Sequence, residues 1–280
     1  MRRPRRLLAI DLSNQVWRNL HANHQLRSAD GKFTGGLYGF LVGMAAAIRD
    51  TEATHVVVCR DAKPYVRSLT YPEYKQLRRK QERPEDREAF QESMGYVLAA
   101  LDMLGVPTMM AEGFESDDCI ARLAIVHRNR FELIVAHSGD SDLHQLLWLP
   151  NLRVMAKSFA QAMDGDTLFA NTGLTPEQFV VALALQGTHN DVAGIPGVGP
   201  VTAARAIRDP ALMRTMRERH LATIERNLSL IRLPHPDMPP LPLPGRTRDF
   251  NPRAFYRFLG QFDIEATQTM LDAFESINRT

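Results

Sequence analysis

Seven acidic residues follow four short apolar runs in the first half of the chain. The runs cover residues 7–12, 55–59, 106–110 and 133–137. The acids at or just after their ends are Asp11, Asp61, Glu115, Asp117, Asp118, Asp140 and Asp142, and Asp191 in the second half is an eighth candidate. Because ligands bind outside the carboxyl ends of strands in an open parallel sheet, we expect these side chains to meet at one edge.

Such crowding of acids is costly unless cations lie among them. Two unit charges about 4 Å apart repel by roughly 4 kcal/mol at an effective dielectric constant near 20. Oxygen ligands without cysteine or histidine favour Mg²⁺ or Mn²⁺ over zinc. Two such ions about 4 Å apart can activate a water and stabilise the leaving oxygen of a phosphodiester. The alternative is that single acids cap helices, as Asp11, Asp61 or the sequence Ser116-Asp117-Asp118 could.

The elements that must position these acids are short strands alternating with helices. The strands are mostly aliphatic, as expected for strands buried on both faces. Helical spacing of apolar residues occurs over 37–49, 83–104 and 117–128. This alternation predicts an α/β fold, a parallel sheet flanked by helices, within residues 1–170.

The second region, residues 171–280, is expected to be mostly helical. Thr175 before Pro176 is typical of a helix start. Further helices are predicted over the ranges 201–207, 211–230 and 254–274. The proline-rich residues 233–244 are predicted to be an irregular connector.

Composition excludes several classes of protein. The 280 residues carry 34 Lys and Arg against 32 Asp and Glu, so a uniformly basic surface for nucleic acid is excluded and any such site must be local. Two cysteines are too few for a disulfide framework and indicate a reducing compartment. No apolar run is long enough to span a membrane, and the first apolar stretch is too short for a signal peptide. We therefore expect a cytoplasmic protein.

A basic segment with interleaved tyrosines follows Asp61. Its residues are Lys63, Arg67, Lys75, Arg78, Arg79 and Lys80 with Tyr65, Tyr71 and Tyr74, against the single acid Glu73. Cations neutralise phosphates and tyrosine faces stack on bases. A helix beginning near Pro72 would present them in two stripes at i,i+4 spacing. The alternative is an ordinary solvated helix face.

A glycine-rich loop precedes a predicted helix at residues 194–200. Its glycines are Gly194, Gly197 and Gly199. Glycine permits close backbone approach, and free N–H groups at a helix start favour a phosphate. Residues 200–232 carry seven Arg against three acids, as expected of a surface that faces a duplex. The alternative is a tight structural turn. Trp17 and Trp148 are expected to pack in the interior rather than stack on bases.

Two acidic blocks carry a resemblance to a known family. Residues 111–121 (AEGFESDDCIA) resemble its Gly-x-Glu-Ala-Asp-Asp-x-Ile block, and residues 138–146 (SGDSDLHQL) resemble its Ser-x-Asp-x-Asp-Leu-x-Gln-Leu block. In this order they resemble the 5′→3′ exonuclease and flap endonuclease family, which includes the nuclease domain of bacterial DNA polymerase I. The resemblance runs over residues 7–230.

The resemblance implies a PIN-like nuclease domain with a helical arch over residues 62–95 and a helix–three-turn–helix element over residues 175–208. One Mg²⁺ or Mn²⁺ would lie among Asp11, Asp61, Glu115, Asp117 and Asp118, and a second among Asp140, Asp142 and Asp191. Lys75 and Arg78 would stabilise charge on the scissile phosphate, a role suited to preorganised cations. DNA would contact Arg67, Tyr74, Arg79, Gly197, Gly199, Thr202 and Arg205, with K⁺ at the glycine loop.

Two positions depart from the family pattern. Thr188 stands where similar proteins usually have the first Asp of Gly-Asp-x-x-Asp, so we expect weaker binding of the second metal. Val201 stands where Lys is common, and Arg205 and Arg208 could compensate.

The sequence therefore predicts a monomeric, metal-dependent 5′ nuclease that hydrolyses DNA at 5′ ends, flaps or overhangs, or the RNA of a primer–DNA hybrid. One alternative is a ribonuclease on the same acidic core. The other is a non-catalytic DNA-binding protein with a decayed second metal site. This alternative is suggested by Thr188 and Val201, which depart from the family pattern.

Overall fold

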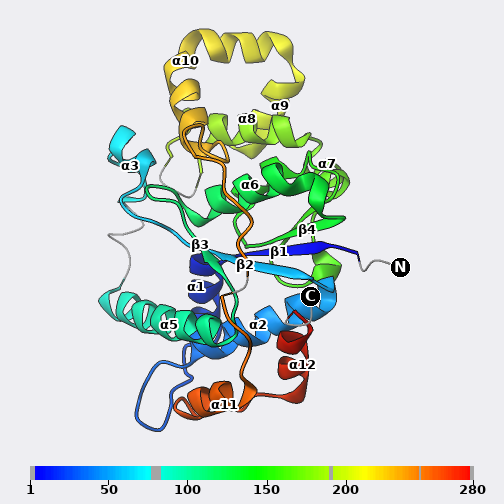
Figure 1. Cartoon of the computed structure of the whole chain (residues 1–280). Coiled ribbons are helices and arrows are strands. Elements are labelled where there is room, and N and C mark those ends of the chain that lie inside the picture. The colour runs from blue at the N-terminus through cyan, green and yellow to red at the C-terminus, as the bar shows by residue number, and fades with distance from the viewer. Residues whose placement is uncertain (1–3, 77–82, 189–191, 246, 278–280) are drawn as a thin grey trace.

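A five-stranded, all-parallel sheet forms the centre of the molecule (Figure 1). The computed structural model describes residues 4–76, 83–188, 192–245 and 247–277. The strands are β1 (Arg6–Asp11), β2 (His55–Cys59), β3 (Thr108–Met109), β4 (Leu133–His137) and β5 (Leu152–Met155), in the order β3-β2-β1-β4-β5. Ile10 lies opposite both Val58 and His137, so β1, β2 and β4 end at the same edge. The predicted α/β fold with a parallel sheet is confirmed.

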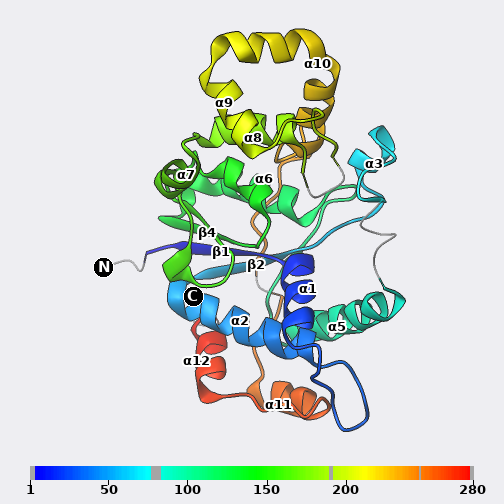
Figure 2. The same cartoon turned by 180° about the vertical axis from the view of Figure 1, so that it is seen from behind.

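The sheet is buried on both faces, which explains its unbroken apolar runs. Leu8 and Ile10 of β1 belong to one core cluster, and Leu7 and Ala9 belong to another. The helices α1 (Leu12–Ala22), α2 (Gly35–Thr51) and α5 (Pro84–Met103) cover the first face, and α6 (Ser116–His127) covers the second (Figures 1 and 2). The predicted helices 37–49, 83–104 and 117–128 match three of these closely. Helix α1 and strand β5 were not predicted.

The C-terminal helical prediction over residues 254–274 is wrong, because two helices occupy this stretch. Helix α11 (Pro252–Gly260) ends before Asp263, which has a left-handed backbone (φ 54°). Helix α12 (Gln268–Ser276) begins with a new cap, in which the Thr267 side chain accepts a hydrogen bond from the Met270 N–H. Both helices contribute to the core on the α2 side of the sheet.

Four helices form the part of the chain between β5 and the connector. They are α7 (Gly165–Thr172), α8 (Pro176–Gln186), α9 (Pro200–Arg208) and α10 (Pro210–Ile231), and the last bends at His220, whose backbone is not helical. The predicted start of α8 is confirmed, because Thr175 and Gln178 form a reciprocal capping box. Helices α8, α9 and α10 share a separate small core that includes Leu185, Ala203 and Ile224.

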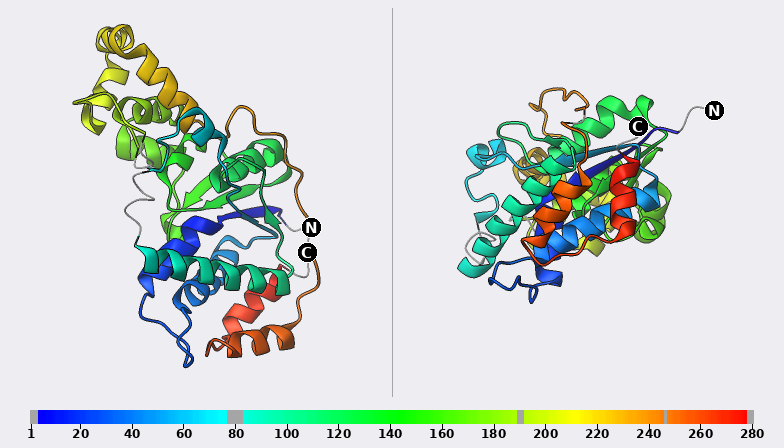
Figure 3. Two further views of the ribbon diagram at one scale, coloured as in Figure 1. Left: turned by 90° about the vertical axis from the view of Figure 1, so that its left-hand side faces the viewer. Right: turned by 60° about the horizontal axis from the view of Figure 1, so that its bottom comes forward.

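The proline-rich connector is irregular, as predicted, and lies along the molecule between α10 and α11 (Figure 3). It is anchored by the buried side chains of Leu233, Met238 and Leu241, which join the core on the α6 side of the sheet. Arg122 of α6 donates to the Met238 carbonyl, and the His127 ring lies 3.1 Å from the Leu241 carbonyl. The connector thus returns the chain to the α2 side, where α11 and α12 pack. The boundary between residues 1–170 and 171–280 stays a prediction.

The basic segment begins with a short helix, α3 (Val66–Thr70), followed by turns. The predicted helix from Pro72 is wrong over residues 72–75. Tyr74 N–H donates to the Tyr71 carbonyl in a turn, and Lys75 has a left-handed backbone (φ 58°). Arg78 and Arg79 lie outside the described residues. Short 3₁₀ helices complete the described elements at Arg128–Arg130, Ser141–Leu146 and Phe159–Gln161. None of the helices in the described ranges combines the length and apolar composition needed to cross a bilayer.

Candidate metal centre

Five of the predicted acids line one cavity of about 410 Å³ at the carboxyl edge of the sheet. Asp11 ends β1, and Asp61 lies two residues beyond β2. The others are Glu115 and Asp117 at the start of α6 and Asp140 after β4. The sheet therefore brings together acids that are far apart in the sequence, as the strand-end argument requires.

Asp11 is held by three hydrogen bonds at the buried end of β1. As the N-cap of α1, its Oδ1 accepts from the Asn14 N–H at 3.2 Å. The hydroxyl groups of Ser116 and Ser138 donate to it at 2.8 and 2.9 Å. Burial, together with repulsion from Asp61, nevertheless raises the pKa of Asp11 to about 6. Its negative charge is therefore incompletely compensated by the protein.

Asp61 is held in a similar way from two sides. The Ser13 hydroxyl donates to its Oδ2 at 2.6 Å, and the Ser116 N–H donates to its Oδ1 at 2.9 Å. Ser116 thus bridges the carboxylates of Asp11 and Asp61. Sequence reasoning missed this role for Ser13, Ser116 and Ser138. The pattern that could have revealed it is a serine within two residues of an acid after three different strands.

The first turn of α6 concentrates three carboxyl groups. Glu115, Asp117 and Asp118 each offer an oxygen within 4.8 Å of the others, and all three are buried. A helix N-terminus favours acids, and Glu115 and Asp118 also form a reciprocal capping box with backbone N–H groups. Burial, with repulsion from Glu115 and Asp118, raises the pKa of Asp117 well above its usual value.

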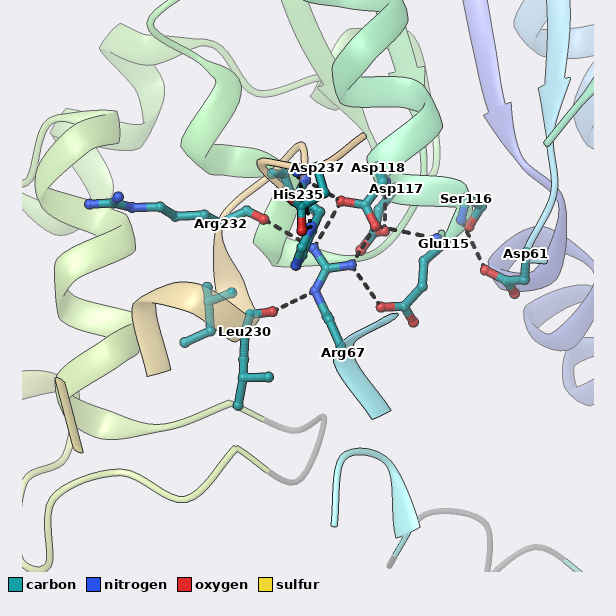
Figure 4. Close-up of polar contacts among 12 residues, drawn as sticks. Asp61, Arg67, Glu115, Ser116, Asp117, Asp118, Leu230, Arg232, His235 and Asp237 are labelled. Carbon is teal, nitrogen blue, oxygen red and sulfur yellow. Dashed lines mark hydrogen bonds and ion pairs between the residues drawn. The ribbon is translucent and has the colours of Figure 1, made fainter. Parts of the chain in front are cut away.

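Two basic side chains reach these carboxyl groups from the segment after β2, and Figure 4 shows one of them, Arg67. Arg67 forms ion pairs with Asp118 and, at 3.2 Å, with Glu115. Lys75 forms an ion pair with Glu115, and the Tyr74 hydroxyl donates to Glu115 Oε2 at 2.8 Å. Burial opposes the charged forms of Arg67 and Lys75, but their acidic partners outweigh it and raise the pKa of both side chains.

The structure places Arg67 and Tyr74 among the acids of α6. Their side chains are buried, with 3% and 4% exposure, and are hydrogen-bonded to these acids. The reason is electrostatic, because buried carboxylates require nearby donors and cations. Their contact with DNA stays a prediction. Lys75 lies at the same acids and lines the cavity.

The cavity has the donor set of a hard-cation site. Its lining groups offer carboxylate, hydroxyl and amide oxygens, and no histidine or cysteine occurs among them. Among the described residues that line it, five carboxyl groups face two lysines, Lys63 and Lys75, so negative charge is in excess there. Burial, and after it repulsion between these acids, raises the pKa of Asp11 and of Asp117. The residues therefore fit Mg²⁺ or Mn²⁺.

The predicted second group of acids is divided by the structure. Asp140 lines the first cavity, where its Oδ1 also accepts from the Asp142 N–H at 2.9 Å. Asp142 instead lines a neighbouring cavity of about 430 Å³ together with Gln186 and Thr188. Asp140 caps the turn that follows, and this separates it from Asp142. Asp191, the third predicted member, lies outside the described residues.

An aromatic wall completes the first cavity. Trp17 of α1 and Phe90 of α5 both line it, with ring centroids 4.9 Å apart and planes at 83°. Trp17 packs against Phe90, as expected, and because α1 starts at the cavity it also lies on the cavity rim. Trp148, which was also expected to pack, has 45% of its surface exposed.

The glycine loop joins α8 to α9 with little side-chain cover. A Cβ atom at Gly194 would lie 2.2 Å from the Gln186 carbonyl carbon, so glycine is required for the close seat of the loop on α8. Gly197 has a left-handed backbone (φ +77°) with no other atom within 4 Å of a Cβ position, and Gly199 caps α9. Arg205 is exposed and Thr202 is half-buried, so the predicted contacts lie at or near the surface.

Comparison with known proteins agrees with this fold. Residues 6–173 match the family of the 5′-3′ exonuclease, N-terminal resolvase-like domain. The chain belongs to this 5′-3′ exonuclease family, and its fold is the PIN-like fold of flap endonucleases.

Three similar proteins illustrate the relationship. DNA polymerase I of Mycobacterium bovis is 29% identical over 218 residues, which cover 75% of this chain but only 24% of that protein. The 5′-3′ exonuclease of Aquifex aeolicus is 29% identical over 72% of this chain and 68% of its own length. The D15 flap endonuclease of bacteriophage T5, solved with DNA and metal ions, has 19% identity and a TM-score of 0.66 over 98% of this chain and 99% of that one.

Proposed function

We propose that this chain is a metal-dependent 5′ nuclease that hydrolyses phosphodiester bonds in DNA at 5′ ends, flaps or overhangs. The observation that carries the proposal is the meeting of Asp11, Asp61, Glu115, Asp117 and Asp140 in one cavity. Family membership supports the reaction class, and the T5 flap endonuclease with DNA and metal ions supports the substrate class. The experiment described below distinguishes exonuclease activity from endonuclease activity.

The chain's own residues perform three tasks in this proposal. The carboxylates of Asp11, Asp61, Glu115 and Asp117 would hold one Mg²⁺ or Mn²⁺ ion, and Asp140 with Asp142 would help to hold a second. When bound, such ions supply a nucleophilic water and neutralise the leaving oxygen. Ser13, Ser116 and Ser138 keep Asp11 and Asp61 oriented. Lys75, with Nζ beside Glu115, would donate to a phosphate oxygen as charge develops there. Arg78 would act beside it.

The nucleic acid would be held by two surfaces. The exposed N–H groups at the start of α9 and the glycine loop would hold a duplex phosphate, with K⁺ at the loop. Arg205 lies on the exposed face of the same helix and would add a second phosphate contact. We further propose that RNA in a primer–DNA hybrid is accepted and that the chain acts as a monomer in the cytoplasm.

A labelled 5′-flap duplex, a 5′-overhang duplex and an RNA hairpin test the proposal. Each is incubated with Mg²⁺, with Mn²⁺ and with excess chelator, using wild-type protein and Asp117→Asn as the matched site variant. We expect metal-dependent cleavage of the DNA substrates and its loss in the variant. Preference for the RNA hairpin would instead support the ribonuclease, and DNA binding without cleavage in any metal would support the decayed site.

A further inference from the structure

The Arg67 side chain contacts two other parts of the chain, the start of α6 and the end of α10 (Figure 4). Its Nε donates to the Leu230 carbonyl at 2.7 Å, and its Nη2 donates to the Arg232 carbonyl at 3.0 Å. Nη2 also donates to Asp118 Oδ1 at 2.8 Å, while Nη1 reaches Asp118 Oδ2 and, at 3.2 Å, Glu115 Oε2. One guanidinium therefore joins α3, the first turn of α6 and the C-terminal end of α10.

Asp118 is fully engaged by this arrangement. Oδ1 accepts from Arg67 and from the His235 N–H at 2.7 Å. Oδ2 accepts from Arg67 and from the Glu115 N–H at 3.3 Å. The side chain is completely buried and, unlike Glu115 and Asp117, does not line the metal cavity. Both carboxylate oxygens of Asp118 thus accept hydrogen bonds from protein donors without any metal ion.

The end of α10 depends on the same contacts. The last carbonyl groups of a helix lack intrahelical partners and carry partial negative charge, which a guanidinium satisfies. Leu230 lies in the last turn of α10, and Arg232 caps it. Helix α10 packs with α9 and the glycine loop in one core. Arg67 therefore joins this helical region to the acids of the metal centre, beside the Gln145 side chain, which donates to the Ile231 carbonyl at 3.0 Å.

We propose that Asp118 is a positioning residue rather than a metal ligand. Its ion pair with Arg67 keeps Glu115 at the cavity and positions the end of α10 beside the metal centre. The pair thereby connects the helices that would bind the duplex to the site of hydrolysis. The part of this inference that concerns turnover rests on the proposed function. The statement that Asp118 is not a metal ligand does not depend on that function and is tested without any substrate.

A crystal structure of the full chain grown with Mn²⁺ tests the ligand assignment directly. We expect anomalous density for Mn²⁺ beside Glu115 and Asp117, with the ion pair between Arg67 and Asp118 intact. An Asp118 oxygen within bonding distance of Mn²⁺, about 2.2 Å, would overturn the proposal. The outcome does not depend on whether the protein cleaves any nucleic acid.

The role in turnover is tested by removing the pair without changing the net charge. The double variant Arg67→Met with Asp118→Asn avoids an unpaired buried charge, which would compromise folding in either single variant. Arg153→Met with Asp164→Asn removes a remote Arg–Asp pair and is the matched control. Thermal melting establishes that both proteins are folded before kinetic measurement.

We expect the double variant to bind Mn²⁺, measured by electron paramagnetic resonance, within about tenfold of wild type. Its kcat should fall about 100-fold, because small displacements of a positioned substrate have such effects, while duplex affinity in Ca²⁺ changes little. Weaker duplex affinity with unchanged kcat would show that Arg67 binds a phosphate and would overturn the inference. Absence of cleavage by the wild type would refute the proposed function and leave the Mn²⁺ structure to decide the ligand assignment.

Discussion

The ammonium group of Lys75 lies against the carboxylate of Glu115, a contact between the segment after β2 and the first turn of α6. Lys75 keeps 19% of its side chain exposed, whereas Glu115 is almost completely buried. The left-handed backbone of Lys75 turns the chain over the cavity at this point. A cation is therefore held at the edge of an acidic cavity, where it faces the carboxylates.

Lys75→Ala should reduce turnover far more than binding. A preorganised cation that acts on developing charge contributes to kcat, and we expect a loss of about 100-fold. Affinity for a 5′-overhang duplex should weaken by less than roughly threefold, which is below 1 kcal/mol. Single-turnover cleavage and fluorescence anisotropy give the two quantities. The exposed Lys157 provides the control Lys157→Ala, and a collapse of binding alone would refute the role assigned to Lys75.

Asp11→Asn should stabilise the metal-free protein at neutral pH. The folded-state pKa of Asp11 is about 6, against 3.8 for an ordinary Asp. Its contribution to stability is therefore fully present below pH 3.8 and is lost as the pH rises through 6. This difference corresponds to about 3 kcal/mol, which the neutral Asn avoids.

Urea unfolding in excess chelator at pH 4 and pH 7.5 measures this effect. We expect the two proteins to be similar in free energy of unfolding at the lower pH and the variant to be more stable at the higher pH. Added Mn²⁺ at pH 7.5 should stabilise the wild type more than the variant. Asp166→Asn on the exposed first turn of α7 is the control, and a difference that does not vary with pH would contradict the burial argument.

The sheet and the acids at its edge could be predicted from sequence because they depend on local pattern. Fully buried parallel strands give unbroken apolar runs, and β2 and β4 have the predicted bounds. The orientation of Arg67 could not be predicted, since its partners Leu230 and Asp118 come from distant segments. The same holds for Trp17, whose place on the cavity rim follows from the start of α1 directly after Asp11.

Two further places have conformations that the spacing of residues did not predict. Residues 72–75 have helix-compatible sequence, yet Lys75 takes a left-handed backbone because its side chain pairs with Glu115. Asp140 and Asp142 are neighbours in sequence, but the 3₁₀ turn that Asp140 caps places them in different cavities. In both places tertiary contacts decide a conformation that spacing alone leaves open.

Trp17→Ala should impair the handling of the terminal nucleotide. Trp17 and Phe90 form the aromatic wall of the cavity, and aromatic faces stack on bases with about 1–3 kcal/mol per base. We expect KM for a 5′-overhang substrate to rise about tenfold or more, and Trp17→Phe to restore most of the loss. An abasic 5′-terminal nucleotide should abolish the difference between wild type and Trp17→Ala. A uniform loss on both substrates would instead indicate a packing defect.

Thr188→Asp should lower the Mg²⁺ concentration that gives half-maximal cleavage. Thr188 lines the second cavity together with Asp142, so an added carboxylate there would supply the oxygen ligand that the sequence lacks. Thr188→Asn is the matched control, because it has nearly the same size as Asp without the charge. Cleavage of the 5′-flap duplex over a range of Mg²⁺ concentrations measures the effect. Equal Mg²⁺ dependence in the Asp variant and the wild type would show that this cavity does not contribute a metal ion to the reaction.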